Sequence, residues 1–249
     1  MTHKTAFLLA LMAAAMVFPV SADEVLKPPA SATNTENFDF APGGVIRIGN
    51  SFGDLYIEAW DQPRVELTVT KTMPYDYALG HPEIAAQRLQ DVKVVAEKRS
   101  AAEIMISTNL PAKRGLPRHP LAPSKTRGVG IEYQLRVPRT SRLIIHHLVG
   151  LISVRGVTGD IEAACHRGDI VLWLPDNGTY SIDAKNKLGK ASSDFTGDSH
   201  SEFLVGQKFE SAHSAPAQRL SLHMGFGGIT LKPILLESEA PASSSESAK

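Results

Sequence analysis

Residues 150–174 read GLISVRGVTGDIEAACHRGDIVLWL, and the spacing of their glycines indicates the fold. Gly150, Gly159 and Gly168 stand nine residues apart, and hydrophobic residues recur at every second position after each glycine. Glycine adopts positive φ where a chain must turn, and this alternation marks a strand with one buried face. The stretch therefore predicts successive turn-and-strand units.

The same pattern of a glycine followed by alternating hydrophobic residues occurs earlier in the chain, where Gly44 and Gly53 are also nine residues apart. A looser copy stands at Gly228-Ile229. The offsets after these glycines predict an inward set that comprises Ile46, Ile48, Leu55, Ile57, Ala59, Ile152, Val154, Ile161, Ala163, Cys165, Ile170, Leu172 and Leu174. The intervening, outward set comprises Arg47, Tyr56, Glu58, Ser153, Arg155, Glu162 and His166. Because a sandwich would not need an equal step, the pattern favours an all-β solenoid.

Four further strands are expected from alternation alone, at residues 64–70, 131–137, 180–184 and 220–224. Residues 73–128 interrupt the repeat as an irregular insertion. It holds one short helix that starts at Pro82 and a proline-rich second half that is predicted to be a surface loop. The expected organisation is a linker over 23–37, a β-solenoid domain over 38–236 and a disordered tail over 237–249.

The first 22 residues have the features of a signal peptide. Lys4 precedes an apolar stretch from Ala6 to Val17, and Val20-Ser21-Ala22 offers small residues for cleavage before Asp23. We expect an exported chain, periplasmic or at the cell surface, without a transmembrane segment in its mature form. Cys165 is the one cysteine, so it has no internal disulfide partner and is expected to be buried.

These residues resemble the bacterial putative-adhesin domains of unknown function, also described as the head domain of adhesin-like proteins. The resemblance lies in the Gly-Asp-Ile series, in residues 174–190 and in the closing run from Leu222 to Ile229. It implies a right-handed β-solenoid in an exported protein. That family carries no agreed catalytic residues, so the resemblance transfers none.

Motifs for chemistry are weak. Asp54, Asp160 and Asp169 directly follow glycine, which does not match the spacing of calcium-binding rolls and predicts instead turn aspartates whose side chains cap nearby backbone N–H groups. His146 and His147 are adjacent and would point to opposite faces of a strand, so no metal site is predicted. No cofactor is expected either.

An enzymatic role would need convergent carboxylates. The outward candidates are Glu58, Glu162 and Asp183, and nothing in the sequence pairs them. Lys and Arg together number 26, as do Asp and Glu, so no overall charge favours nucleic acid.

Two features could bind a partner. Trp60 and Trp173 have outward parity, and exposed indoles can stack on sugars or dock a protein. A basic stretch in the insertion, which could contact an anionic polymer or lipid head groups, comprises Lys113, Arg114, Arg118, Lys125 and Arg127.

The sequence thus favours a non-catalytic binding or structural element of the cell envelope, whose partner is an envelope polymer or another envelope protein. The alternative is a polysaccharide-active β-helix enzyme, a lyase or a hydrolase. The oligomeric state does not follow from the sequence.

Overall fold

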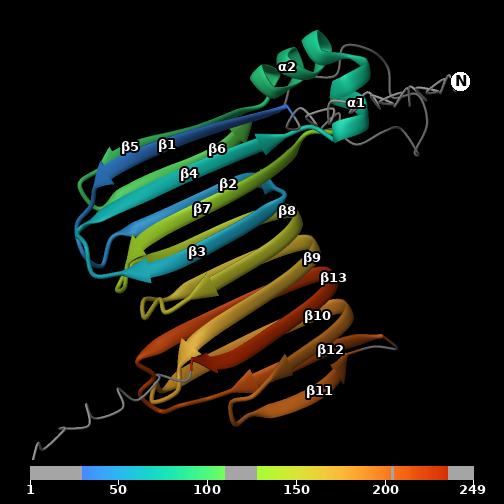
Figure 1. Ribbon diagram of the computed structural model, residues 1–249. Coiled ribbons are helices and arrows are strands. Elements are labelled where there is room, and N and C mark those ends of the chain that lie inside the picture. Colours follow the sequence, from blue (N-terminus) through green and yellow to red (C-terminus); the bar gives the residue numbers. More distant parts are fainter. Residues whose placement is uncertain (1–29, 110–127, 203–204, 235–249) are drawn as a thin grey trace, which may run out of the picture.

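Alternating hydrophobic residues form long strands throughout the computed structural model, which describes residues 30–109, 128–202 and 205–234 (Figure 1). The strands are β1 (Ser31–Asp39), β2 (Val45–Phe52), β3 (Asp54–Trp60), β4 (Arg64–Thr72), β5 (Lys93–Ser100), β6 (Glu103–Asn109), β7 (Gly130–Pro138), β8 (Arg142–Arg155), β9 (Ile161–Pro175), β10 (Tyr180–Ser193), β11 (Asp198–Glu202), β12 (Gly206–Ser211) and β13 (Gln218–Ile234). The helices are α1 (Tyr75–Gly80) and α2 (Pro82–Asp91). The all-β class predicted from the sequence is confirmed.

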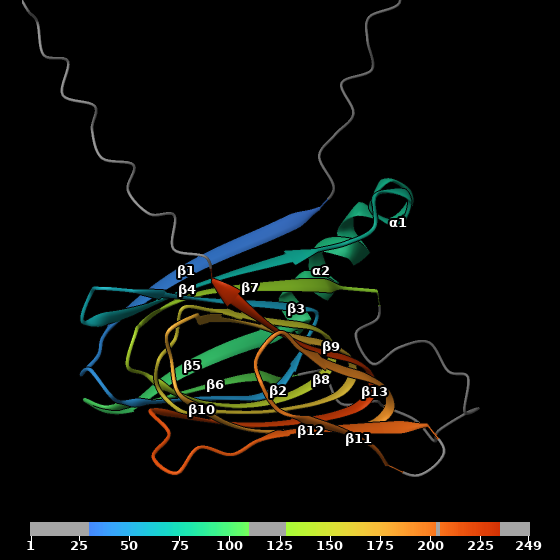
Figure 2. The same cartoon turned by 90° about the horizontal axis from the view of Figure 1, so that it is seen from below.

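The four longest strands, β8, β9, β13 and β10, each contribute to two faces. The first half of β8 pairs with β2 and its second half with β3, both in parallel. Seen along the stack in Figure 2, the strands curve around a shared interior. We call the layer made by the first halves of these strands the first face, and the layer made by their second halves the second face.

A column of glycines forms the bend between the two faces. The column consists of Gly53, Gly150, Gly168, Gly227 and Gly189, and all five have positive φ. A Cβ atom on Gly168 would lie 1.9 Å from the carbonyl oxygen of Gly150 in the neighbouring strand. Since contacts this short are impossible, only glycine fits each bend.

Gly159 belongs to a different corner, where a Cβ atom would meet the carbonyl oxygen of Ser141 at 2.3 Å. Successive glycines of the nine-residue step therefore serve opposite corners of the molecule. Leu143 on β8 aligns with Ile161 on β9, so the structural repeat between these strands is two steps long.

The predicted inward residues form the core between the faces. Ile46, Leu55, Ile152, Ile161 and Ile170 are all at most 1% exposed, and the other members of the inward set are buried except Ala59, which is half-buried. Alternation thus gave the correct face at each of these positions.

The right-handed solenoid expected from the step is not confirmed. The described strands make one mixed sheet of 13 strands that is not closed, with antiparallel pairs at β1–β4, β4–β7, β5–β6, β10–β12 and β11–β12. In addition, β13 lies between β9 and β10 and is parallel to both, so the order of strands departs from the order of the chain.

Two parts of the chain differ from the expected organisation. Residues 31–37, assigned to a linker, belong to β1, because Thr33 and Thr35 face Thr70 and Thr68 in an antiparallel pair with β4. The insertion contains the predicted helix, α2, but also α1 and the strands β5 and β6. The strands were missed because apolar residues do not alternate cleanly there: Val94 and Val95 are adjacent, and Met105 stands between Ile104 and Ile106. Among the described residues, no helix is long and apolar enough to cross a membrane.

Candidate binding surface on the second face

Trp60 lies at the end of β3 on the outer side of the second face, as its parity predicted. Its indole N–H donates a hydrogen bond of 2.9 Å to the carbonyl oxygen of Arg64. The guanidinium groups of Arg64 and Arg136 lie 5.0 and 5.9 Å from the ring centroid. Such distances are typical of cation–π contacts, so the indole holds two cations in place.

Trp173 lies on β9 and repeats this arrangement. Parallel pairing aligns it with Arg155 on β8 and with Lys232 on β13. The Arg155 guanidinium lies 5.7 Å from the ring centroid and the Lys232 ammonium 5.3 Å from it. The ring is half-buried between these two neighbours.

The two tryptophans belong to one continuous surface. Strand pairing aligns a single row of outward residues across β7, β3, β8, β9 and β13, and we call it the outer row: Arg136, Glu58, Arg155, Trp173 and Lys232. Neighbouring strands are about 4.8 Å apart, so the row is about 19 Å long. Arg136 also pairs with Glu66 at 3.2 Å.

A shallow groove of about 460 Å³ accompanies the outer row. Its lining includes Tyr56, Glu58, Gln134, Arg136, Ser153 and Arg155. Partial burial raises the pKa of Tyr56, and the carboxylates of Asp54 and Glu132 raise it further. Tyr56 is therefore a neutral hydroxyl at physiological pH that can donate a hydrogen bond.

Sequence reasoning missed the partners of the tryptophans, although a signal for them exists. Glu58, Arg155, Trp173 and Lys232 each stand five residues after a column glycine. Equal offsets in parallel strands at matched bends predict a common row. The predicted basic residues Lys113, Arg114, Arg118, Lys125 and Arg127 lie outside the described residues.

The aspartates that follow the glycines do cap backbone N–H groups, but those of neighbouring strands and not those of their own turns. The Asp169 carboxylate accepts a hydrogen bond of 2.8 Å from the Gly228 N–H, and Asp160 accepts one of 2.9 Å from the Arg219 N–H. Asp54 accepts a longer bond, of 3.4 Å, from Leu151. These side chains connect strands that are distant in the sequence.

Cys165 is buried as predicted, and burial raises the pKa of its thiol to about 11. His146 is exposed and His147 is buried, so the two do point to opposite faces. Nδ1 of His147 lies 2.8 Å from the Ser51 hydroxyl and Nε2 lies 2.9 Å from the carbonyl oxygen of Gly53. Burial lowers the pKa of His147, which identifies it as a neutral structural group.

The carboxylates considered for an enzyme do not converge. Glu58 lies on the second face, whereas Glu162 and Asp183 lie on the first face and are separated by Ser221 of β13. Across two strand spacings, about 10 Å separates the backbones of that pair. In the described part of the chain, no three His, Cys, Asp or Glu side chains are grouped to hold a metal ion.

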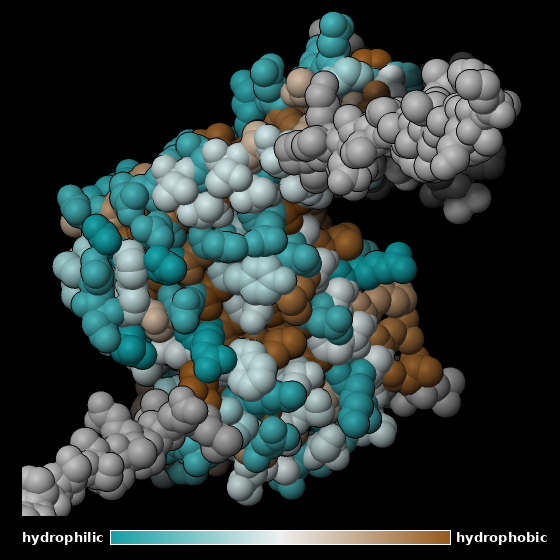
Figure 3. Space-filling view, viewed as in Figure 1, coloured by the Kyte–Doolittle hydropathy of each residue, from teal (hydrophilic) through white to brown (hydrophobic). Residues whose placement is uncertain are grey.

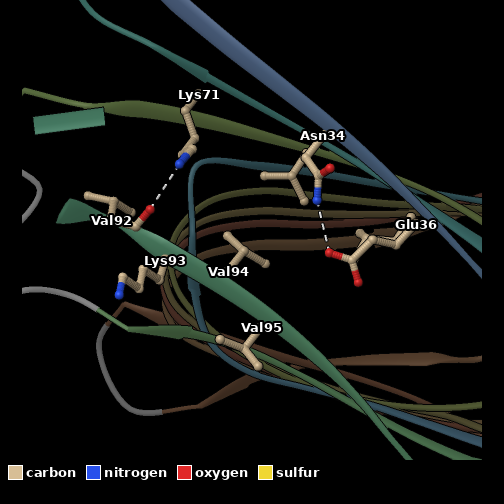
Figure 4. Close-up of a pocket in the computed structure, with 9 residues that line it drawn as sticks. Asn34, Glu36, Lys71, Val92, Lys93, Val94 and Val95 are labelled. Carbon is tan, nitrogen blue, oxygen red and sulfur yellow. Dashed lines mark hydrogen bonds between the residues drawn. The ribbon is translucent and has the colours of Figure 1, made fainter. Parts of the chain in front are cut away.

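A second hollow opens between the edge strands β1 and β5, and Leu67 and Val69 of β4 also line it. Figure 4 shows Lys71, Asn34 and Glu36 around it. The Lys71 ammonium donates to the carbonyl oxygens of Leu89, at 2.6 Å, and Val92, at 3.1 Å. Burial lowers the pKa of Lys71. The Asn34 amide donates to Glu36 at 2.9 Å. The Lys71 contacts thus hold the end of α2 against β4, whereas the Asn34–Glu36 contact lies within β1.

No protein-family model matches the chain, and no curated protein matches it. Among solved structures, it is similar to a putative cell adhesion protein from Clostridium sporogenes, with 10% identity, 82% of this chain and 100% of that chain covered, and a TM-score of 0.44. A putative adhesin from Bacteroides fragilis shows 11% identity, coverage of 83% and 99%, and a TM-score of 0.27.

A putative lipid binding protein from Parabacteroides distasonis shows 9% identity, coverage of 81% and 62%, and a TM-score of 0.26. Proteins named as putative adhesins are thus found among the structural neighbours, which agrees with the resemblance stated from the sequence. All three TM-scores are below 0.5, so these similarities do not identify a function.

Proposed function

We propose that this chain is an exported, non-catalytic binding element of the bacterial cell envelope, and that its outer row holds an anionic envelope polymer. The observation that carries the proposal is the alignment of Arg155, Trp173 and Lys232, with both cations stacked against one indole. We also interpret the four bent strands as solenoid-like coils, which their shared register supports.

The cations of the second face are suited to such a ligand. A stacked guanidinium or ammonium group has already lost part of its rotational freedom, so binding an anion costs less entropy. Trp60 orders Arg64 and Arg136 in the same way. A row of about 19 Å exceeds one sugar or phosphate group, which favours a polymer with repeated negative charges.

Glu58 and Glu66 limit the positive charge on this face. Glu58 is aligned between Arg136 and Arg155, and Glu66 pairs with Arg136. Arg155 and Lys232 therefore supply the positive charge on either side of Trp173. We expect moderate affinity that falls steeply with salt, because the contacts are exposed.

Affinity electrophoresis of the full chain against polygalacturonate, with neutral dextran as reference, tests this proposal. The double variant Arg155→Ala/Lys232→Ala should bind polygalacturonate about tenfold more weakly, in line with the loss of two exposed charge contacts. Arg47→Ala is the matched control, since Arg47 is an exposed arginine of the first face that pairs with Glu103 at 2.9 Å. Equal retardation of the double variant and the wild type would contradict the proposal.

Export needs its own experiment. In cell fractionation, the protein should be recovered from the envelope or periplasm with a mass that corresponds to a start at Asp23. An unprocessed chain in the cytoplasm would show that the first 22 residues do not act as a signal peptide.

A further inference from the structure

The outer side of the glycine bends carries a row of exposed side chains. Each member directly precedes a column glycine, and strand pairing aligns them on β8, β9, β13 and β10; we call this row the ridge: Val149, Arg167, Phe226 and Leu188. Val149 and Phe226 are each 49% exposed, and Leu188 is 37% exposed. The corresponding residue on β2, Phe52, is buried, so the ridge begins at β8.

More apolar surface lies beside the ridge. Val205, 60% exposed, is next to Leu188, since its carbonyl oxygen accepts a hydrogen bond of 3.3 Å from the Gly189 N–H. Figure 3 shows apolar surface gathered along the right-hand edge of the molecule, where these strands bend. Grouped exposed apolar residues of this kind mark interaction sites.

Cations accompany the apolar residues. Arg167 stands in the middle of the ridge, and the exposed Lys187 and Lys190 flank Leu188. The Asp169 carboxylate nearby is engaged by the Gly228 N–H. Next to Phe226, an open hollow is lined by His166, Arg167 and Asp169 and by the column glycines Gly168 and Gly227.

We propose that the ridge docks this protein on an anionic lipid surface. Phe226, Val149 and Leu188 enter the boundary between head groups and acyl chains, while the cations contact lipid phosphates. A convex bend lined by protruding apolar side chains and by Lys and Arg has the features of a membrane-binding surface. Apposed ridges of two copies would instead gather two sets of these cations, Arg167, Lys187 and Lys190, in one interface.

The test places a fluorescent probe on the ridge of the full chain. Val149→Cys is labelled with an environment-sensitive dye, since the native Cys165 is buried and its thiol pKa is raised to about 11. Vesicles of phosphatidylglycerol with phosphatidylcholine should shift the emission to the blue and raise it severalfold. Pure phosphatidylcholine vesicles should have little effect. Ile84→Cys, at a 46% exposed apolar site of α2, is the matched control and should not respond.

Phe226→Ser in the labelled chain should weaken the response to anionic vesicles about tenfold, because the chain loses an aromatic side chain that inserts into the membrane. The same change should leave polygalacturonate binding intact, so failure here is distinct from failure of the outer-row proposal. The lipid proposal is overturned if anionic vesicles give no shift, or if Ile84→Cys responds equally. A concentration-dependent shift without vesicles would also overturn it and would identify a contact between copies.

Discussion

At the scale of single residues, the bends depend on a missing Cβ atom. Gly168 combines a φ of 138° with a neighbouring carbonyl oxygen that leaves no space for a side chain. We expect Gly168→Ala to lower the free energy of unfolding by more than about 4 kcal/mol, measured by chemical denaturation. Gly43→Ala is the control, because Gly43 has a φ of 77° but no other atom within 4 Å of the place that a Cβ atom would take.

The control should cost only about 1–2 kcal/mol, the usual penalty of positive φ. Similar losses in both variants would mean that backbone strain, and not the packing of adjacent strands, explains the column.

His147 provides a pH-dependent prediction at the same scale. Burial lowers its pKa in the folded state below the ordinary 6.5, so the unfolded chain takes up a proton first as the pH falls. The free energy of unfolding is therefore highest above pH 6.5, where His147 is neutral in both states, and it decreases as the pH falls through and below that value. Strand pairing through β9 and β13 aligns His147 of β8 with Asn186 of β10. The Asn186 amide donates a hydrogen bond of 2.6 Å to the carbonyl oxygen of Gly227. His147→Asn should therefore keep a donor without titrating.

Melting temperatures between pH 7.5 and 5.5 should fall more steeply for the wild type than for His147→Asn. The other histidines are common to both proteins, so their effect cancels in the comparison. Parallel curves would show that His147 is not linked to stability.

At the scale of elements, the sequence predicted strands wherever alternation was long. Residues around Leu135 in β7 and around Ile182 in β10 were placed correctly, since one buried face imposes a period of two. Residues 31–37 were wrongly assigned to a linker, because β1 is an edge strand that is mostly exposed and owes its conformation to β4. The outer row was half predicted. Parity placed both tryptophans outward. Equal offsets after the glycines could have given the members of the row, but placing Arg155 and Lys232 on either side of Trp173 requires the pairing of β8, β9 and β13.

At the scale of the whole molecule, the most consequential feature is the position of β13. It pairs with β9 and with β10, so Leu220 meets Ile161 and Ile182, although the chain passes through β10, β11 and β12 before reaching it. Sequence periodicity carries no information on this order, because any strand with the same inward offsets could occupy the gap. Pairing between distant segments also slows folding, since the loop must close before contacts form.

Removing β13 should therefore affect the whole fold. A chain ending at Ala217 would leave the inner edges of β9 and β10 without their partner, and the two strands have no pairing of their own in the described sheet. We expect it to lose cooperative thermal unfolding in circular dichroism and to bind a hydrophobic dye. A chain ending at Ile234 is the control, since it retains all described strands and should melt as the full chain does. A peptide of residues 218–234, added in trans, should restore cooperativity by strand addition. If the chain ending at Ala217 melts cooperatively at the temperature of the full chain, β13 is a peripheral strand and its central position in the sheet is wrong.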